Sequence, residues 1–355
     1  MLRERYDAVM TTELMQRLSL THPIVLGPFG GGFSTAALTA GVSNAGGLGS
    51  FGAHHLPPDR ILQAAADIRA QTSRPFAINI WASNHDPGGA SPNRDDMRRV
   101  LDRLRPYFEE LGLEPSDPPT RAVHDVHEQA RAVIEARPAV FSIIFGPPPP
   151  DIVRECKARD IMLVGAATTP DEAQALAAAS MDAIVASGFE AGGHRPSFLA
   201  PAEDSLHGTM ALVPLLASLV DVPIIAAGGI ADARGVTAAL RLGAQAAQVG
   251  TAFLACDESA APQIHRDQLF SANARWTVLS RVYSGRLARG IRNRLYDDLR
   301  EADRLPYPAQ GWLIGLIRDA AIEQGRADLI SLWCGQAAGL LTHRKAADLM
   351  AALIS

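Results

Sequence analysis

The sequence contains little cysteine, no long apolar run and no excess of basic residues. Its 355 residues include only 3 cysteines, which are too few for a disulfide framework and fit a reducing cytoplasm. The 33 basic residues are outnumbered by 38 acidic ones, and the net charge of -5 argues against nucleic acid or an anionic membrane as a partner. No stretch is apolar enough to span a membrane, and residues 1–21 lack the apolar core of a signal peptide. We therefore expect a cytoplasmic protein with a small-molecule ligand.

The composition also limits the class of fold. With 47% hydrophobic residues the chain is too apolar to be disordered, and its 30 glycines and 24 prolines exclude a coiled coil. The length allows two domains, or a single α/β barrel of about 250 residues with an appendage.

Short apolar runs alternate with alanine-rich segments along most of the sequence. The runs are apolar on both faces, as parallel strands covered by helices should be. The eight predicted strands are residues 24–28, 48–51, 76–80, 140–145, 161–165, 183–187, 223–227 and 246–250. Helices are predicted between them at 34–45, 59–71, 151–158, 170–179, 210–220 and 232–242. Eight such units favour a (β/α)8 TIM barrel over an open sheet.

Two segments interrupt this alternation. After the third strand, residues 82–120 contain turn residues, a charged helix at 94–111 and a proline-rich end, and we expect this excursion to leave the upper face of the barrel. The tail contains predicted helices at 312–324, 329–341 and 344–354. We expect a cofactor-binding barrel at 1–268 and a helical C-terminal extension at 269–355 that packs over the barrel and covers the substrate site.

Glycines follow several predicted strands, at the end of the barrel where active sites lie. Glycine lets a backbone approach a ligand closely and point its N–H groups at phosphate oxygens. We therefore expect a phosphate site there rather than ordinary tight turns. The GxGxxG pattern at 47–52 does not indicate a dinucleotide site, because a helix precedes it and prolines follow it. The glycines at strand ends are Gly27, Gly192, Gly193, Gly228, Gly229 and Gly250.

His194 is the strongest candidate for a catalytic side chain, because it follows two of these glycines at a strand end. An imidazole suits proton abstraction near neutral pH, and a loop histidine bonded to a carbonyl is the competing interpretation. His124 and His127 are spaced i, i+3 on a predicted helix without a third ligand nearby, so they indicate a solvated face rather than a metal site. His54 and His55 are placed at the mouth of the barrel.

Three segments in combination resemble the nitronate monooxygenase family, formerly called 2-nitropropane dioxygenases. They are SNAGGLG at 43–49, EAGGHR at 190–195 and QVGTAFL at 248–254, and the resemblance extends over most of the chain. It implies a (β/α)8 barrel that binds FMN and uses O2 to oxidise nitronates or nitroalkanes to a carbonyl compound and nitrite. It also implies that His194 is the general base, while the flavin carries the redox chemistry.

The resemblance assigns the cofactor contacts as well. Asn79 would contact the flavin or its ribityl chain, and residues Gly27, Pro28 and Phe29 would lie against the isoalloxazine. Ser187 stands where many members have glutamine, a change that removes one long amide contact to the flavin. The residues implied to hold the phosphate end are Gly192, Gly193, Gly229, Gln248, Gly250 and Thr251. The strand-end glycine Gly228 is also expected to bind the cofactor.

Two further points stay open at the level of sequence. Ser284 opens the segment SGRLAR, and its hydroxyl is either a contact to substrate or flavin or part of a turn. The same barrel and Gly-Gly-His loop also resemble FMN-dependent NAD(P)H reductases of the enoyl-acyl-carrier-protein or quinone type. The segment at 248–259 is more similar to the monooxygenases, so the reductase is the alternative.

Overall fold

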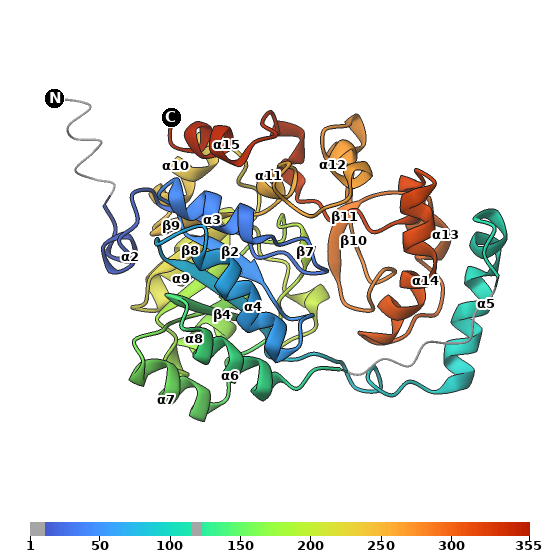
Figure 1. Cartoon of the computed structure of the whole chain (residues 1–355), viewed down its shortest axis with the longest axis horizontal. Coiled ribbons are helices and arrows are strands. Elements are labelled where there is room, and N and C mark those ends of the chain that lie inside the picture. Colours follow the sequence, from blue (N-terminus) through green and yellow to red (C-terminus); the bar gives the residue numbers. More distant parts are fainter. Residues whose placement is uncertain (1–10, 115–122) are drawn as a thin grey trace.

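The computed structural model of the chain describes residues 11–114 and 123–355 (Figure 1). Eight parallel strands form one sheet in the order β1-β9-β8-β6-β5-β4-β3-β2. A parallel bridge between Val25 and Leu48 joins its two ends, and the sheet closes into a barrel. The predicted (β/α)8 barrel is therefore confirmed. The end of the predicted excursion, from Pro115 to Thr120, lies outside the described residues.

All eight predicted strands are present, with ends that shift by one or two residues. Alternate side chains of each strand pack against the helices or into the barrel: Ile24 and Leu26 belong to the outer cluster, and Val25 belongs to the inner one. Both faces are therefore apolar, as the sequence pattern indicated. The strands are β1 (Ile24–Leu26), β2 (Gly49–Gly52), β3 (Phe76–Trp81), β4 (Val140–Ile144), β5 (Met162–Ala167), β6 (Ala183–Ser187), β8 (Ile224–Ala227) and β9 (Ala246–Val249).

The helices of the barrel begin at capping residues. Thr35, Thr169 and Asp232 each accept a hydrogen bond from a backbone N–H of the first turn that follows. At the end of the barrel where the strands begin, α2 (Glu13–Arg17) adds Leu14 and Met15 to the inner cluster. The outer helices are α3 (Ala36–Asn44), α4 (Pro58–Arg69), α6 (Val126–Ala136), α7 (Pro150–Ala158), α8 (Pro170–Ala178), α9 (Thr209–Leu219) and α10 (Ala233–Arg241).

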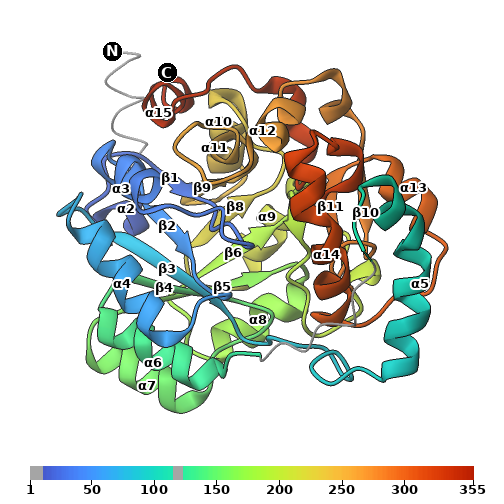
Figure 2. The same ribbon diagram turned by 45° about the vertical axis from the view of Figure 1, so that its right-hand side comes forward.

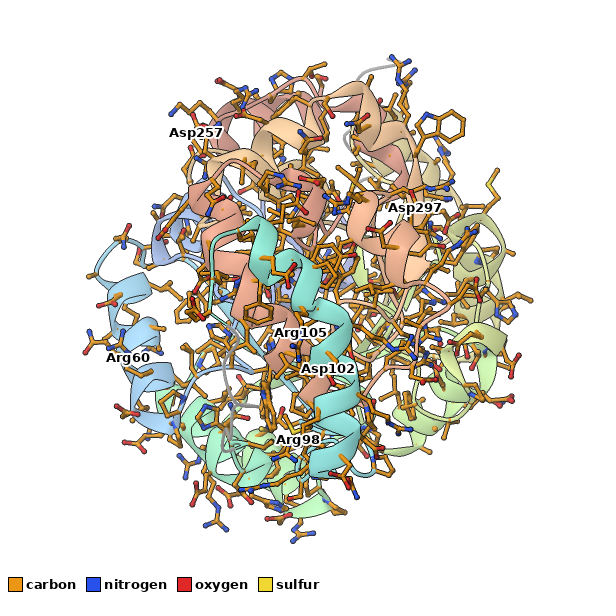
Figure 3. All side chains as sticks on the ribbon, turned by 90° about the vertical axis from the view of Figure 1, so that its right-hand side faces the viewer. Arg60, Arg98, Asp102, Arg105, Asp257 and Asp297 are labelled. Atoms are coloured by element: carbon orange, nitrogen blue, oxygen red, sulfur yellow. The ribbon has the colours of Figure 1, made fainter. Side chains whose placement is uncertain are left out.

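The excursion after β3 carries α5 (Arg94–Glu110), close to the predicted helix. Its apolar residues recur three and four positions apart and are buried, whereas Arg98, Asp102 and Arg105 are exposed on the opposite face (Figure 3). The hydroxyl of Tyr107 donates to Asp298 at 2.9 Å. Because Asp298 belongs to the C-terminal extension, α5 lies beside α13 (Arg294–Leu299) and α14 (Ala309–Glu323) rather than on the barrel wall (Figure 2).

The C-terminal part of the chain contains a second, antiparallel sheet that the sequence did not reveal. Strands β10 (Thr277–Ser280) and β11 (Ala288–Ile291) pair with each other, and β11 pairs with β7 (Gly193–His194), which lies in the loop after β6. The strand pairing therefore connects the extension directly to the loop that contains His194. Two short elements, α11 (Thr251–Leu254) and α12 (Gln263–Leu269), lead from β9 to this sheet.

The predicted helix at 329–341 is wrong. Two short 3-10 helices stand there instead: η3 (Ala327–Leu329) ends at the start of this segment, and η4 (Gln336–Leu340) lies near its end. Between them the backbone runs along β11, where the N–H of Ile291 donates to the carbonyl of Leu332 at 2.8 Å. Pairing with a distant strand therefore overrides the local helix preference. The third predicted tail helix is present as α15 (Ala346–Leu353), which packs on α3 and α10 of the barrel (Figure 1).

Candidate active site

A cavity of about 370 Å³ opens at the carboxyl ends of the barrel strands. Loops after the strands form its inner wall, and the C-terminal extension contributes Tyr283, Tyr307 and Trp333. Every site residue predicted from the sequence lines this one cavity. These residues are Gly27, Pro28, Phe29, Asn79, Ser187, Gly192, Gly193, His194, Gly228, Gly229, Gln248, Gly250, Thr251 and Ser284.

Bare backbone forms one side of the cavity. Gly228 has a φ of +109°, and a Cβ there would lie 2.9 Å from Thr209 Oγ1 and 3.1 Å from the backbone nitrogen of Ala191. At Gly192 a Cβ would lie 2.6 Å from the backbone nitrogen of Gly335. At Gly250, by contrast, a Cβ would meet no protein atom within 4 Å. Gly192 and Gly228 are therefore required because other backbone segments pack closely against them, whereas the space at Gly250 is open to a ligand.

The glycine loops after β6 and β8 are held together by Glu190. Its two carboxylate oxygens accept from the backbone N–H of Thr209 at 3.0 Å, and one of them also accepts from the Thr209 hydroxyl. A carboxylate at the first residue of α9 complements the positive end of that helix. The Thr209 hydroxyl also lies 3.0 Å from the carbonyl of Gly228. Sequence reasoning missed this role of Glu190, although the residue stands within the EAGGHR segment.

The amide side chains of the cavity come from strand ends. Asn79 is buried on β3, and its Nδ2 donates to Ser142 Oγ at 2.8 Å. Its orientation is therefore fixed by the neighbouring strand β4. Gln248 lies on β9 and lines the same cavity. Ser187 ends β6, and its carbonyl accepts from the guanidinium of the buried Arg195 at 2.6 Å.

His194 is fixed on both sides. Its backbone pairs with Ala288 of β11, and its Nε2 lies 2.8 Å from the hydroxyl of Ser284. The Ser284 hydroxyl donates to the carbonyl of Arg286 at 3.2 Å, so its oxygen is available to accept from His194 Nε2–H. This tautomer leaves the Nδ1 lone pair free to take a proton. The contact with His194 was not among the roles expected for Ser284.

Burial lowers the pKa of His194 to about 3, and the positive charge of Arg286 adds to the effect. The imidazole is therefore neutral at physiological pH. It can accept a proton, but its charged form is stable only beside a compensating negative charge. This property favours an anionic partner in the cavity.

Aromatic rings surround His194. The rings of Trp81 and Trp333 lie 5.1 and 5.3 Å from its centroid, and that of Tyr307 lies 6.2 Å away. Trp81 ends β3, one residue beyond the predicted strand, whereas Tyr307 and Trp333 come from the extension. Sequence reasoning missed all three: Trp81 fell just outside the predicted strand, and only the fold brings Tyr307 and Trp333 over the strand ends.

Arg286 joins the excursion, a barrel loop and the extension. Its guanidinium lies between the rings of Phe145 and Tyr307, at 4.2 and 4.4 Å. It donates to Asp86 Oδ1 at 2.8 and 2.9 Å and to the carbonyl of Ser83 at 2.9 Å. These groups are far apart in the sequence, so this buried arginine joins three segments behind Tyr307, which lines the cavity.

The other candidates from the sequence lie elsewhere. His127 is on α6, half-exposed and 3.7 Å from Asp151. Among residues 11–114 and 123–355 there is no group of three side chains suited to hold a metal ion. In the same part of the chain no helix is long and apolar enough to cross a membrane. The three cysteines are buried free thiols.

Comparison with known proteins supports one family. The family described as nitronate monooxygenase matches residues 12–355. A nitronate monooxygenase of Pseudomonas aeruginosa is 40% identical over 354 residues, which cover 97% of this chain and 99% of that protein. Nitroalkane oxidase from Streptomyces ansochromogenes superimposes with a TM-score of 0.87 at 32% identity and covers 96% of each chain.

A second solved structure is less similar. FabK from Thermotoga maritima gives a TM-score of 0.73 at 26% identity, with 97% of this chain and 94% of that chain covered. The sequence match over nearly the whole chain and the greater structural similarity agree with each other. The chain therefore belongs to the nitronate monooxygenase family of oxidoreductases.

Proposed function

We propose that this protein binds FMN and uses O2 to oxidise nitronates, and more slowly nitroalkanes, to a carbonyl compound and nitrite. The observation that carries the proposal is a neutral, half-buried His194 that lines a glycine-walled cavity in a chain of this family. We also propose that residues 1–268 bind the cofactor, that residues 269–355 cover the substrate, and that the enzyme acts in the cytoplasm.

The residues present fit a flavin mononucleotide. Gly192, Gly228, Gly229 and Gly250 offer backbone N–H groups to a phosphate, together with the hydroxyl of Thr251. The cavity itself has no acidic side chain among its described lining residues, so no negative charge opposes a phosphate.

The remaining contacts suit the rest of the cofactor. Asn79 and Gln248 supply amide groups for the ribityl chain or the polar edge of the ring, and Ser187 supplies a smaller hydroxyl. The segment Gly27, Pro28 and Phe29 would lie against the isoalloxazine. When bound, FMN would supply the transfer of electrons from the nitronate to O2.

The chain's own contribution to a nitroalkane substrate is proton abstraction. The bond from the α-carbon to hydrogen breaks, a bond from that hydrogen to His194 Nδ1 forms, and the electron pair moves onto the nitro group. Ser284 holds the ring in the required tautomer by accepting from Nε2. Since the pKa of His194 is lowered to about 3, the imidazolium would be stable only while paired with the new nitronate anion. We therefore expect preformed nitronates, which need no base, to be the better substrates.

The alternative is an FMN-dependent NAD(P)H reductase, for which FabK is the structural counterpart. Its lower structural similarity makes it the weaker candidate. Anaerobic mixing of the flavin-loaded protein with propyl-1-nitronate or with NADH separates the two. We expect the nitronate to bleach the flavin absorbance rapidly and NADH to leave it unchanged. Rapid bleaching by NADH with none by the nitronate would establish the reductase instead.

A further inference from the structure

A second imidazole, that of His54, lines the cavity from the turn after β2. Its ring stacks face to face on Trp81, with centroids 3.8 Å apart and planes inclined by 3°. On its edge, a Cβ added at Gly30 would lie only 2.9 Å from His54 Cε1. The residue is only 9% exposed, and these neighbours fix both the position and the tilt of its ring.

Buried side-chain amides form hydrogen bonds to the backbone of this turn. Gln129 Nε2 donates to the carbonyls of His54 and Leu56, at 2.9 and 2.8 Å. Gln129 Oε1 in turn accepts from Asn84 Nδ2 at 2.9 Å. Gln129 is fully buried on α6 and is itself held by Asn84 of the excursion, so two other segments fix the backbone at His54, one directly and one through Gln129. The position is therefore rigid before any ligand binds.

The two ring nitrogens of His54 have different surroundings. In the part of the chain that the structure describes, Nδ1 is enclosed and has no hydrogen-bond partner, whereas Nε2 is not among the enclosed nitrogens. A buried N–H without an acceptor is rarer in proteins than an acceptor without a donor. The favoured tautomer therefore carries its proton on Nε2, the nitrogen on the cavity side.

The ring is also uncharged. Burial lowers the pKa of His54 well below 6.5, and proximity to the positive Arg286 and to His55 and His194, which would repel a second protonated imidazole, adds to this effect. His54 is thus a neutral hydrogen-bond donor in the cavity. His54 and His194 both line the cavity, and Trp81, which lines it too, contacts both rings at centroid distances of 3.8 and 5.1 Å.

We propose that His54 donates a hydrogen bond from Nε2 to a nitro oxygen of the substrate, while His194 takes the proton from the α-carbon. This inference rests on the proposed function. As the electron pair of the C–H bond moves onto the nitro group, negative charge grows on its oxygens, and a fixed N–H donor there stabilises it. His54 keeps its own proton throughout. The base and the donor then act on opposite ends of the same conjugated group.

Two variants separate hydrogen bonding from packing. His54→Phe keeps an aromatic ring on Trp81 and removes the donor, whereas His54→Gln removes the ring and keeps an N–H at a similar reach. His55→Phe is the matched control, because His55 is the adjacent histidine but is not among the residues that line the cavity. For each flavin-loaded protein, kcat/KM for nitroethane and the dissociation constant of nitrite are measured, the latter from the change in flavin absorption.

We expect His54→Phe to lower kcat/KM for nitroethane and to weaken nitrite binding, each by about 10- to 100-fold, the usual worth of a hydrogen bond to a charged group. His54→Gln is expected to recover most of both losses, and His55→Phe to match the wild type. A fully active His54→Phe protein, or equal losses in both His54 variants, would assign the residue to packing and overturn the inference. If the wild type itself oxidises no nitronate, the proposed function fails instead.

Discussion

The barrel and the C-terminal extension contribute different kinds of group to the same cavity. The barrel supplies glycine backbone and amide side chains at strand ends, such as Gly228 and Asn79. The extension supplies the surroundings of His194, through Ser284, Tyr307 and Trp333. We propose a division of labour, in which the barrel binds the cofactor and the extension sets the protonation and the access of the proposed base, His194.

The largest expected effect comes from removing that base. Replacing His194 by Asn is expected to lower kcat/KM for neutral nitroalkanes by about 10²- to 10⁴-fold, the range typical of a lost general base. Preformed nitronates need no proton abstraction, so their turnover should fall much less. Steady-state kinetics on nitroethane and ethylnitronate provide the measurement. Equal losses on both substrates would show that His194 binds the substrate rather than deprotonating it.

The second effect tests the contact between the two regions. Arg286→Met removes the charge that bonds Asp86 and Ser83, and it leaves the partly buried Asp86 carboxylate without this partner. We expect the free energy of unfolding to fall by about 2–4 kcal/mol, as for other broken buried pairs.

Urea titration of the flavin-loaded proteins gives this value. Arg105→Met is the matched control, because Arg105 pairs with Asp102 on the exposed face of α5 and should change stability little (Figure 3). If both variants lose the same stability, the two regions are not joined through Arg286.

The smallest effect concerns pH and involves His265 on α12, just before the extension begins. Burial lowers the pKa of His265 to about 4, so the unfolded chain takes up a proton below pH 6.5 that the folded chain does not. Stability is therefore complete above about pH 6.5 and falls as the pH is lowered toward 4. At pH 5 the loss from this one residue amounts to about 2 kcal/mol.

His265→Gln is expected to remove that part of the acid sensitivity, because glutamine does not titrate and can still donate to the carbonyl of Trp333. Thermal unfolding between pH 7 and 5 measures the difference. His54 and His194, which are also buried and have lowered pKa values, remain in both proteins and contribute equally. An unchanged pH profile would mean that His265 is protonated in the folded state.

The same two regions differ in how much the sequence revealed. The barrel strands and the glycines at their ends were predicted correctly, because apolar alternation and glycine placement are local signals. The antiparallel sheet of β7, β10 and β11 and the extended path of 330–335 were not, because pairing between distant segments leaves no local pattern. For the same reason the sequence identified His194 but not its contact with Ser284 or its aromatic neighbours. His54 was placed at the mouth of the barrel, but its stacking on Trp81 required the fold.

The central claim is that the glycine-walled cavity binds one FMN per chain. The most direct measurement is the flavin content of the purified protein, with FMN added back to any colourless fraction while its absorption spectrum is followed. The account predicts a yellow protein with one equivalent of FMN, released on denaturation. If the purified protein is colourless, and if adding it to FMN leaves the absorption spectrum of free FMN unchanged, the cavity does not bind FMN.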